Sequence, residues 1–183
     1  MNILNLYFSS TGNTEKVAKR IGNTARGLGY PVDTVKITGN DLNLDILKYD
    51  VVFVGSGVYA QLPGKALIDL FREHIQRYAK AGQIKAASPR RPSAYCVVYC
   101  TYGGAHTGIH EAVPAVKYMG QLFDHLGYTI LDEWYVIGEY RTERLQDMSV
   151  SGRLGDIRGR PNEQDLKDVE ERVKGALGSI KGA

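Results

Sequence analysis

The sequence predicts an α/β fold in which a parallel sheet carries helices on both faces. Short apolar runs typical of strands alternate with longer segments whose apolar residues recur at helical spacing. Two of the runs, at residues 51–54 and 95–99, are apolar throughout, which is expected of central strands buried on both faces. A helical segment between consecutive strands is the connection that parallel strands require.

The individual elements follow from these patterns. Strands are expected at residues 3–8, 31–37, 51–55, 94–100 and 128–137. Apolar stripes at helical spacing cover residues 17–28, 66–78, 112–126 and 166–177. Gly29 and Gly127 end the first and third of these helices, and Pro161 with Asn162 marks the start of the last. Residues 41–49 show no clear period. Residues 138–161 form a long connection before the last helix, of a length that is often functional.

The composition bounds the class of protein. With 183 residues and 43% hydrophobic content, the chain fits one domain spanning residues 1–183. No apolar run approaches the ~20 residues of a membrane span, and the first residues lack the basic region of a signal peptide. We therefore expect a cytoplasmic protein without a membrane span. The net charge of +3 comes from scattered basic residues, which does not predict nucleic-acid binding.

The cysteines and histidines predict neither a disulfide nor a metal site. Cys96 and Cys100 lie in one expected strand, which separates their α-carbons by about 13 Å, too far for a disulfide. His106 and His110 have a spacing that could bind a metal, but they lack an obvious third ligand. We expect no metal.

Polar residues directly after the first strand give the strongest functional signal. Five of six consecutive side chains carry a hydroxyl or an amide, whereas an ordinary helix cap needs only one such residue. Backbone N–H groups at such a strand–helix junction form a cradle for a phosphate. Because the stretch contains no lysine or arginine, it suits a single terminal phosphate held by neutral donors. The residues are Ser9, Ser10, Thr11, Gly12, Asn13 and Thr14.

Residues 9–14 resemble the phosphate loop of the flavodoxins, which hold flavin mononucleotide (FMN). The resemblance covers essentially the whole chain, because the five expected strands and the helices between them follow the flavodoxin order. It implies a flavodoxin-like, doubly wound, five-stranded parallel sheet of order 2-1-3-4-5, with FMN at the carboxyl ends of the strands.

The resemblance also implies two loops that face the flavin. The first comprises Ser56, Gly57, Val58, Tyr59 and Ala60, with Tyr59 placed to stack on the ring. The second comprises Thr101, Tyr102, Gly103 and Gly104, with Tyr102 as a candidate for the opposite ring face and backbone amides near the pyrimidine edge. Each tyrosine also fits an ordinary core or surface position.

Three further features have alternative interpretations. Gly55, Gly57 and Ala60 match a dinucleotide-binding fingerprint, but no helix follows directly and no acidic residue lies about 20 positions on. Trp134 is expected to pack in the core. His106 either donates a hydrogen bond to the flavin or to a substrate, or is a solvated loop residue.

The long connection also has alternatives. Its Tyr140, Arg141 and Arg144 could form a lid or a substrate pocket, or else belong to a solvated loop or a dimer contact. The oligomeric state stays open.

The resemblance implies an FMN protein that carries electrons between redox partners, without substrate chemistry of its own. The chain departs from typical flavodoxins in its positive net charge and in the absence of Asp and Glu from residues 57–64 and 101–107. These departures favour an acidic, ferredoxin-like partner or a small acceptor.

The alternative is an NAD(P)H-dependent flavin oxidoreductase of the same fold that reduces a quinone or a similar acceptor. Ala60 stands where flavodoxins have a glycine whose carbonyl turns toward the reduced ring, and this change favours two-electron chemistry. A signalling module without flavin is less well supported, because Asp50 precedes its strand instead of following it.

Overall fold

The computed structural model describes residues 1–39 and 44–181. Of the stretch without clear period, residues 41–43 lie outside the described residues. The strands are β1 (Ile3–Phe8), β2 (Val32–Lys36), β3 (Val51–Tyr59), β4 (Leu62–Pro63), β5 (Tyr95–Tyr102) and β6 (Thr129–Ile137). The α-helices are α1 (Asn13–Gly27), α2 (Lys65–Lys80), α3 (Val113–His125), α4 (Met148–Ser151) and α5 (Glu163–Lys181). Short 3-10 turns are η1 (Ile46–Lys48), η2 (Gly108–Glu111) and η3 (Glu143–Leu145).

Five strands form a parallel sheet of order β2-β1-β3-β5-β6. Since β5 and β6 are the fourth and fifth strands expected from the sequence, the predicted order is confirmed. The short β4 was not predicted; it pairs antiparallel with the end of β3.

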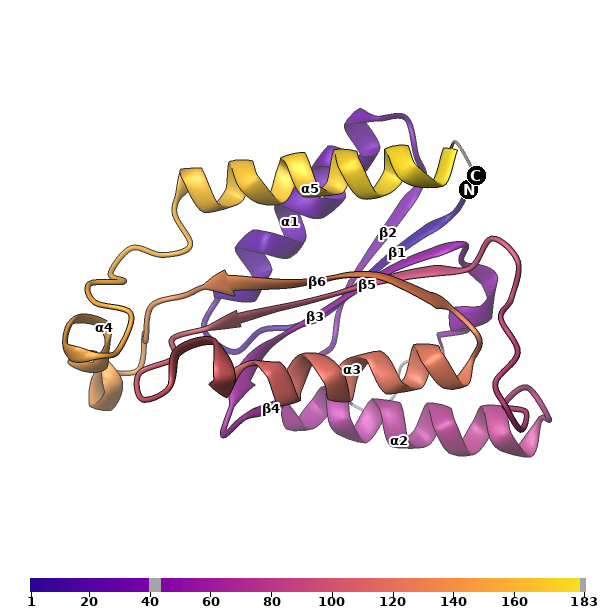
Figure 1. Cartoon of the computed structure of the whole chain (residues 1–183), viewed down its shortest axis with the longest axis horizontal. Helices are drawn as coiled ribbons and strands as arrows, with labels where there is room; N and C mark the ends of the chain where they lie inside the picture. Colours follow the sequence, from indigo (N-terminus) through magenta and orange to yellow (C-terminus); the bar gives the residue numbers. More distant parts are fainter. Residues whose placement is uncertain (40–43, 182–183) are drawn as a thin grey trace.

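Helices cover both faces of the sheet, as Figure 1 shows: α1 and α5 lie on one side, and α2 and α3 on the other. Each side buries its own apolar layer. On the α1–α5 side, Trp134 is fully buried with its ring centroid 5.7 Å from that of Phe53, so its predicted packing role is confirmed. No helix in the described part of the chain is long and apolar enough to cross a membrane.

Two strands run further than the apolar pattern predicts. β3 continues past Gly55 to Tyr59, and β5 continues past Cys100 to Tyr102. The extension of β3 contains a buried Ser56, whose hydroxyl accepts from Gly64 N–H at 2.9 Å and donates to the Gly57 carbonyl at 2.8 Å. A polar side chain satisfied in this way is compatible with a buried strand, which a count of apolar residues does not detect.

The start of the last helix confirms its predicted cap. The Asn162 side-chain oxygen accepts from the N–H groups of Gln164 and Asp165, at 3.0 and 3.1 Å. The Asp165 carboxylate in turn accepts from Asn162 N–H at 2.8 Å, which completes a reciprocal capping arrangement.

The connection at 138–161, expected as a loop, contains the turn η3 and the helix α4. Ser149 and Ile157 are both 2% exposed, and Ile157 N–H donates to the Ser149 carbonyl at 2.8 Å. The segment is therefore folded against the rest of the chain with a small buried centre of its own.

Candidate functional site

A cavity of about 340 Å³ lies at the carboxyl ends of β1, β3 and β5. This edge is where doubly wound sheets bind ligands. Most of the residues predicted from the sequence line it, from all three expected loops; Ser10, Gly12 and Ser56 lie outside the lining. The lining residues are Ser9, Thr11, Asn13, Thr14, Gly57, Val58, Tyr59, Ala60, Gln61, Thr101, Tyr102, Gly103, Gly104, Glu111, Gly138, Glu139, Tyr140, Thr142 and Leu145.

The predicted phosphate loop, residues 9–14, turns tightly into α1. The Ser9 hydroxyl accepts from the N–H groups of Gly12 at 3.1 Å and Glu15 at 3.3 Å. Gly12 has a φ of 95°, a left-handed conformation that glycine adopts without strain. The N–H groups of Asn13 and Thr14 lie in the first turn of α1, where no intrahelical acceptor is available. The loop therefore offers backbone donors at the positive end of a helix.

Two side chains connect this loop to other parts of the cavity. The hydroxyl oxygens of Thr14 and Thr101 lie 2.7 Å apart, which joins α1 to β5. Asn13 donates from Nδ2 to the Glu139 carbonyl at 2.8 Å, while its Oδ1 is buried and has no partner in the described structure. Asn13 is 7% exposed, so this acceptor is suited to a donor from a ligand in the cavity.

The first predicted flavin loop is a hairpin between β3 and β4. Ala60 and Gln61 occupy its tip with φ values of 47° and 64°, so both adopt the left-handed conformation that such a tight turn requires. The Tyr59 hydroxyl lies 2.6 Å from the Ser10 hydroxyl, and its ring lies edge-on to Phe8. The side chain of Tyr59 thus reaches the phosphate loop while remaining 39% exposed.

The second predicted loop differs more from expectation in its aromatic residue. Tyr102 is 8% exposed and belongs to the apolar layer beneath α3, and burial raises the pKa of its hydroxyl. Tyr140 lies over the glycine turn instead: a β-carbon added at Gly103 would fall 2.2 Å from its ring. Its hydroxyl accepts from Ala105 N–H at 3.3 Å. Half-buried Tyr140 is therefore the more accessible aromatic ring at this turn.

Sequence reasoning missed six lining residues. One, Gln61, lies at the tip of the first loop, and the others, Glu111, Gly138, Glu139, Thr142 and Leu145, come from outside the three loops. Glu111 Oε1 accepts from the N–H groups of His106 at 2.6 Å and Thr107 at 2.7 Å. The fold thus places a carboxylate next to residues 101–107, which contain no Asp or Glu. The side chain of His106 is exposed and does not line the cavity. The unusual length of residues 138–161 was the sequence signal for Gly138, Glu139, Thr142 and Leu145.

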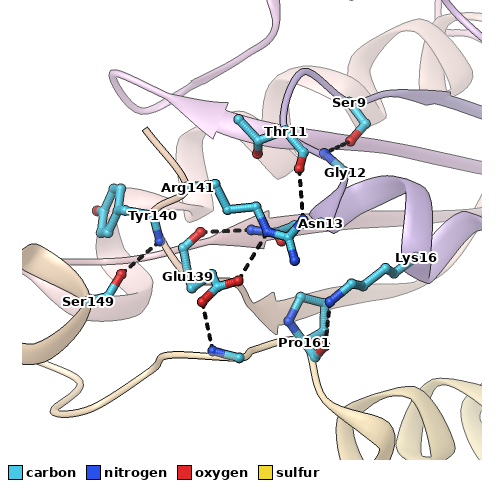
Figure 2. A network of polar contacts seen from close by, with 11 residues as sticks. Ser9, Thr11, Gly12, Asn13, Lys16, Glu139, Tyr140, Arg141, Ser149 and Pro161 are labelled. Carbon is cyan, nitrogen blue, oxygen red and sulfur yellow. Dashed lines mark hydrogen bonds and ion pairs between the residues drawn. The ribbon is translucent and has the colours of Figure 1, made fainter. Parts of the chain in front are cut away.

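Figure 2 shows how the segment after β6 contacts the phosphate loop. Arg141 donates from Nη1 to the Thr11 carbonyl at 3.3 Å and from Nε to Glu139 Oε1 at 3.1 Å. Lys16 donates to the Pro161 carbonyl at 3.4 Å. The loop's own sequence is uncharged, as predicted, and the fold brings the Arg141 guanidinium from a distant segment against the Thr11 carbonyl.

Fold and cavity together define a doubly wound α/β protein with a candidate ligand site at the carboxyl ends of its central strands. The sequence matches the family described as Flavodoxin domain over residues 4–101, more than half of the chain. The chain therefore belongs to the flavodoxin domain family, and this membership indicates a flavin-binding redox function. No curated protein matches the sequence.

Solved structures share the fold at low sequence identity. A flavodoxin from the domain Archaea is 17% identical, with a TM-score of 0.61 and coverage of 99% of both chains. Flavodoxin 2 from Bacillus cereus is 13% identical, with a TM-score of 0.67 and coverage of 98% of this chain and 99% of that one. A flavone reductase is 9% identical, with a TM-score of 0.64 and coverage of 99% of this chain and 63% of that one.

Proposed function

We propose that this chain binds FMN and carries electrons between redox partners. The observation that carries the proposal is the single cavity on which the phosphate loop, the β3–β4 hairpin and the turn after β5 converge. When bound, FMN supplies one- and two-electron redox chemistry, whereas the protein supplies orientation and electrostatics.

The residues present fit this cofactor. Residues 9–14 would hold the phosphate with backbone and hydroxyl donors, and Asn13 Oδ1 would accept from a hydroxyl of the ribityl chain. The flavin ring would lie between the hairpin at Tyr59 and the turn at 101–104, with Tyr140 beside Gly103.

The partner is proposed to be an acidic, ferredoxin-like protein or a small acceptor, because the chain has a net charge of +3. The net charge of +3 already includes the two carboxylates at the cavity, Glu111 and Glu139, and Glu139 is paired with Arg141. We further propose that the protein acts in the cytoplasm as one domain spanning residues 1–183.

One observation favours the oxidoreductase alternative. Tyr140, Thr142 and Leu145, all from the segment after β6, line the same cavity and extend its wall beyond the three flavin loops. A wall of this kind would accommodate a small organic acceptor such as a quinone, with a reduced nicotinamide as the hydride donor.

Anaerobic titration of the purified protein tests both functions. The apoprotein should bind FMN stoichiometrically, and Thr11→Val should weaken binding by about 1–3 kcal/mol if its hydroxyl is a phosphate donor. A carrier should be reduced by a reduced ferredoxin-like protein and react slowly with NADH or NADPH. Rapid bleaching of the flavin by a reduced nicotinamide, together with faster turnover when a quinone is added, would instead support the oxidoreductase. A protein that binds no flavin would refute both.

A further inference from the structure

We propose that Arg141 is a phosphate-binding residue of the cofactor site, supplying the cation that the phosphate loop lacks in its own sequence. This inference rests on the proposed FMN function and adds to it a residue that lies outside all three loops. Arg141 follows β6 and reaches back to the first loop of the chain (Figure 2).

The guanidinium lies directly against the loop. Its Nη1 is 3.3 Å from the Thr11 carbonyl oxygen, and a β-carbon added at Gly12 would be 3.6 Å from the same nitrogen. That separation is an ordinary van der Waals contact, so Arg141 packs against the loop at Gly12, whose φ of 95° favours glycine.

The side chain is held in place by a second contact. Its Nε donates to Glu139 Oε1 at 3.1 Å, and Glu139 Oε2 accepts from Gly159 N–H at 2.7 Å. The guanidinium carries more N–H donors than these bonds use, and 36% of the side chain is exposed. Arg141 is thus oriented at the loop with donors left for an anion.

Other cations near the start of α1 are engaged elsewhere. Lys16 donates to the Pro161 carbonyl at 3.4 Å, and Lys19 and Lys36 pair with Glu15 at 2.8 and 2.7 Å. A phosphate monoester carries a charge of about −1.5 to −2 near neutral pH, so it would compete favourably with the single carboxylate of Glu139 for the guanidinium. Arginine is also the side chain whose donor geometry best matches a phosphate.

A purely structural role for Arg141 makes a different prediction. If the guanidinium only fastens residues 139–141 to the loop, its removal should weaken FMN and riboflavin to the same extent, because riboflavin shares every part of FMN except the phosphate. If it binds phosphate, its removal should affect FMN alone.

The experiment measures the Kd of FMN and of riboflavin for the wild-type apoprotein and for Arg141→Gln, Arg141→Lys and Arg144→Gln. Arg141→Gln should raise the FMN Kd by about tenfold or more and leave the riboflavin Kd unchanged, with Arg141→Lys in between. Arg144→Gln is the control, since this exposed arginine of the same segment has no hydrogen-bond or ion-pair partner among the described residues.

Phosphorus NMR of bound FMN gives a second readout. Arg141 is the charged group in contact with the loop, and Glu139 accepts from its Nε. Glu15 and Lys16 follow in the first turn of α1, where the Glu15 carboxylate pairs with Lys19 and Lys36 and Lys16 donates to the Pro161 carbonyl. Removing the positive charge of Arg141 disfavours the dianion, so the phosphate resonance should titrate at a higher pH in Arg141→Gln than in the wild type.

The outcomes separate the two proposals. If Arg141→Gln leaves the ratio of the FMN and riboflavin Kd values unchanged, whether both flavins bind more weakly or neither does, the role of Arg141 is overturned and the FMN function stays intact. A wild-type protein that binds neither flavin would overturn the proposed function and this inference together.

Discussion

The hydroxyl oxygens of Tyr59 and Ser10 lie 2.6 Å apart, so the tip of the β3–β4 hairpin is hydrogen-bonded to the phosphate loop. This contact joins two of the three segments that line the cavity. The Tyr59 side chain also lies close to Gly57 of the same strand: a β-carbon added at Gly57 would be 2.9 Å from the Tyr59 hydroxyl oxygen.

Removing this hydrogen bond should have a modest and coupled effect on stability. Tyr59→Phe and Ser10→Ala should each lower the free energy of unfolding by about 0.5–1.5 kcal/mol, the usual net value of one hydrogen bond. The double variant should lose less than the sum of the two, since both changes remove the same contact. Urea unfolding of the three variants measures the coupling. Strict additivity would show that the hydroxyl pair contributes nothing.

The contact between Gly103 and Tyr140 gives a second prediction. Gly103→Ala should lower the free energy of unfolding by about 1–3 kcal/mol, because the new methyl group would overlap the tyrosine ring. In a Tyr140→Ala background the same change should be nearly neutral. Gly104→Ala is the control: its φ is 55° and its clash is with the Gly108 backbone, so Tyr140→Ala should not rescue it. Equal losses of Gly103→Ala in both backgrounds would contradict the contact.

The hairpin tip should be stabilised by glycine. Ala60 has a φ of 47°, and a left-handed conformation costs an L-residue with a β-carbon roughly 1–2 kcal/mol. Ala60→Gly should therefore raise the free energy of unfolding, by about 0.5 kcal/mol after the greater freedom of glycine in the unfolded chain is subtracted. Thermal or urea unfolding measures it. Ala79→Gly, at an exposed position in α2, should lower stability instead, and a loss of similar size in Ala60→Gly would refute the strain.

Stability should fall in acid partly through Glu15. Hydrogen bonds from Lys19 and Lys36 lower the pKa of its carboxyl from 4.5 to about 2. Because the pKa is lower in the folded state, the ionised group stabilises the fold above pH 4.5, and this contribution is lost as the pH falls toward about 2.

Glu15→Gln tests this prediction. The difference in unfolding free energy between wild type and variant should be constant near neutral pH and should shrink below pH 4.5. Glu73→Gln is the control, since this exposed carboxyl lies on α2, on the opposite face of the sheet from α1. A difference that does not change with pH would contradict the role of the lysine pair.

The sequence was most informative where local pattern and burial coincide. β1 was predicted with its observed bounds, since Ile3–Phe8 is apolar apart from Asn5 and precedes a polar turn. Helix α5 was located by its stripe and by the Asn162 cap. The end of β3 was not, because Gly55 and Gly57 interrupt the apolar pattern. Gly55 is needed there because the Tyr99 ring occupies the place of its β-carbon, at 2.1 Å.

Contacts between distant segments limited the prediction of the site. The three loops could be found from strand ends, but the contact of Asn13 with Glu139 spans 126 residues, and no local pattern indicates it. Tyr102 was chosen for its position at a strand end. It lines the cavity, and alternation along β5 also places it in the apolar layer under α3. Tyr140 and Arg141 were singled out as members of a long connection, without a signal for where the chain would place them.

The segment after β6 also sets the order in which the cavity can come into existence during synthesis. Its walls combine residues of the phosphate loop with Tyr140, Thr142 and Leu145. The ribosome adds the second group more than 120 residues after the first. A nascent chain that has not yet reached residue 145 therefore lacks part of the cavity wall.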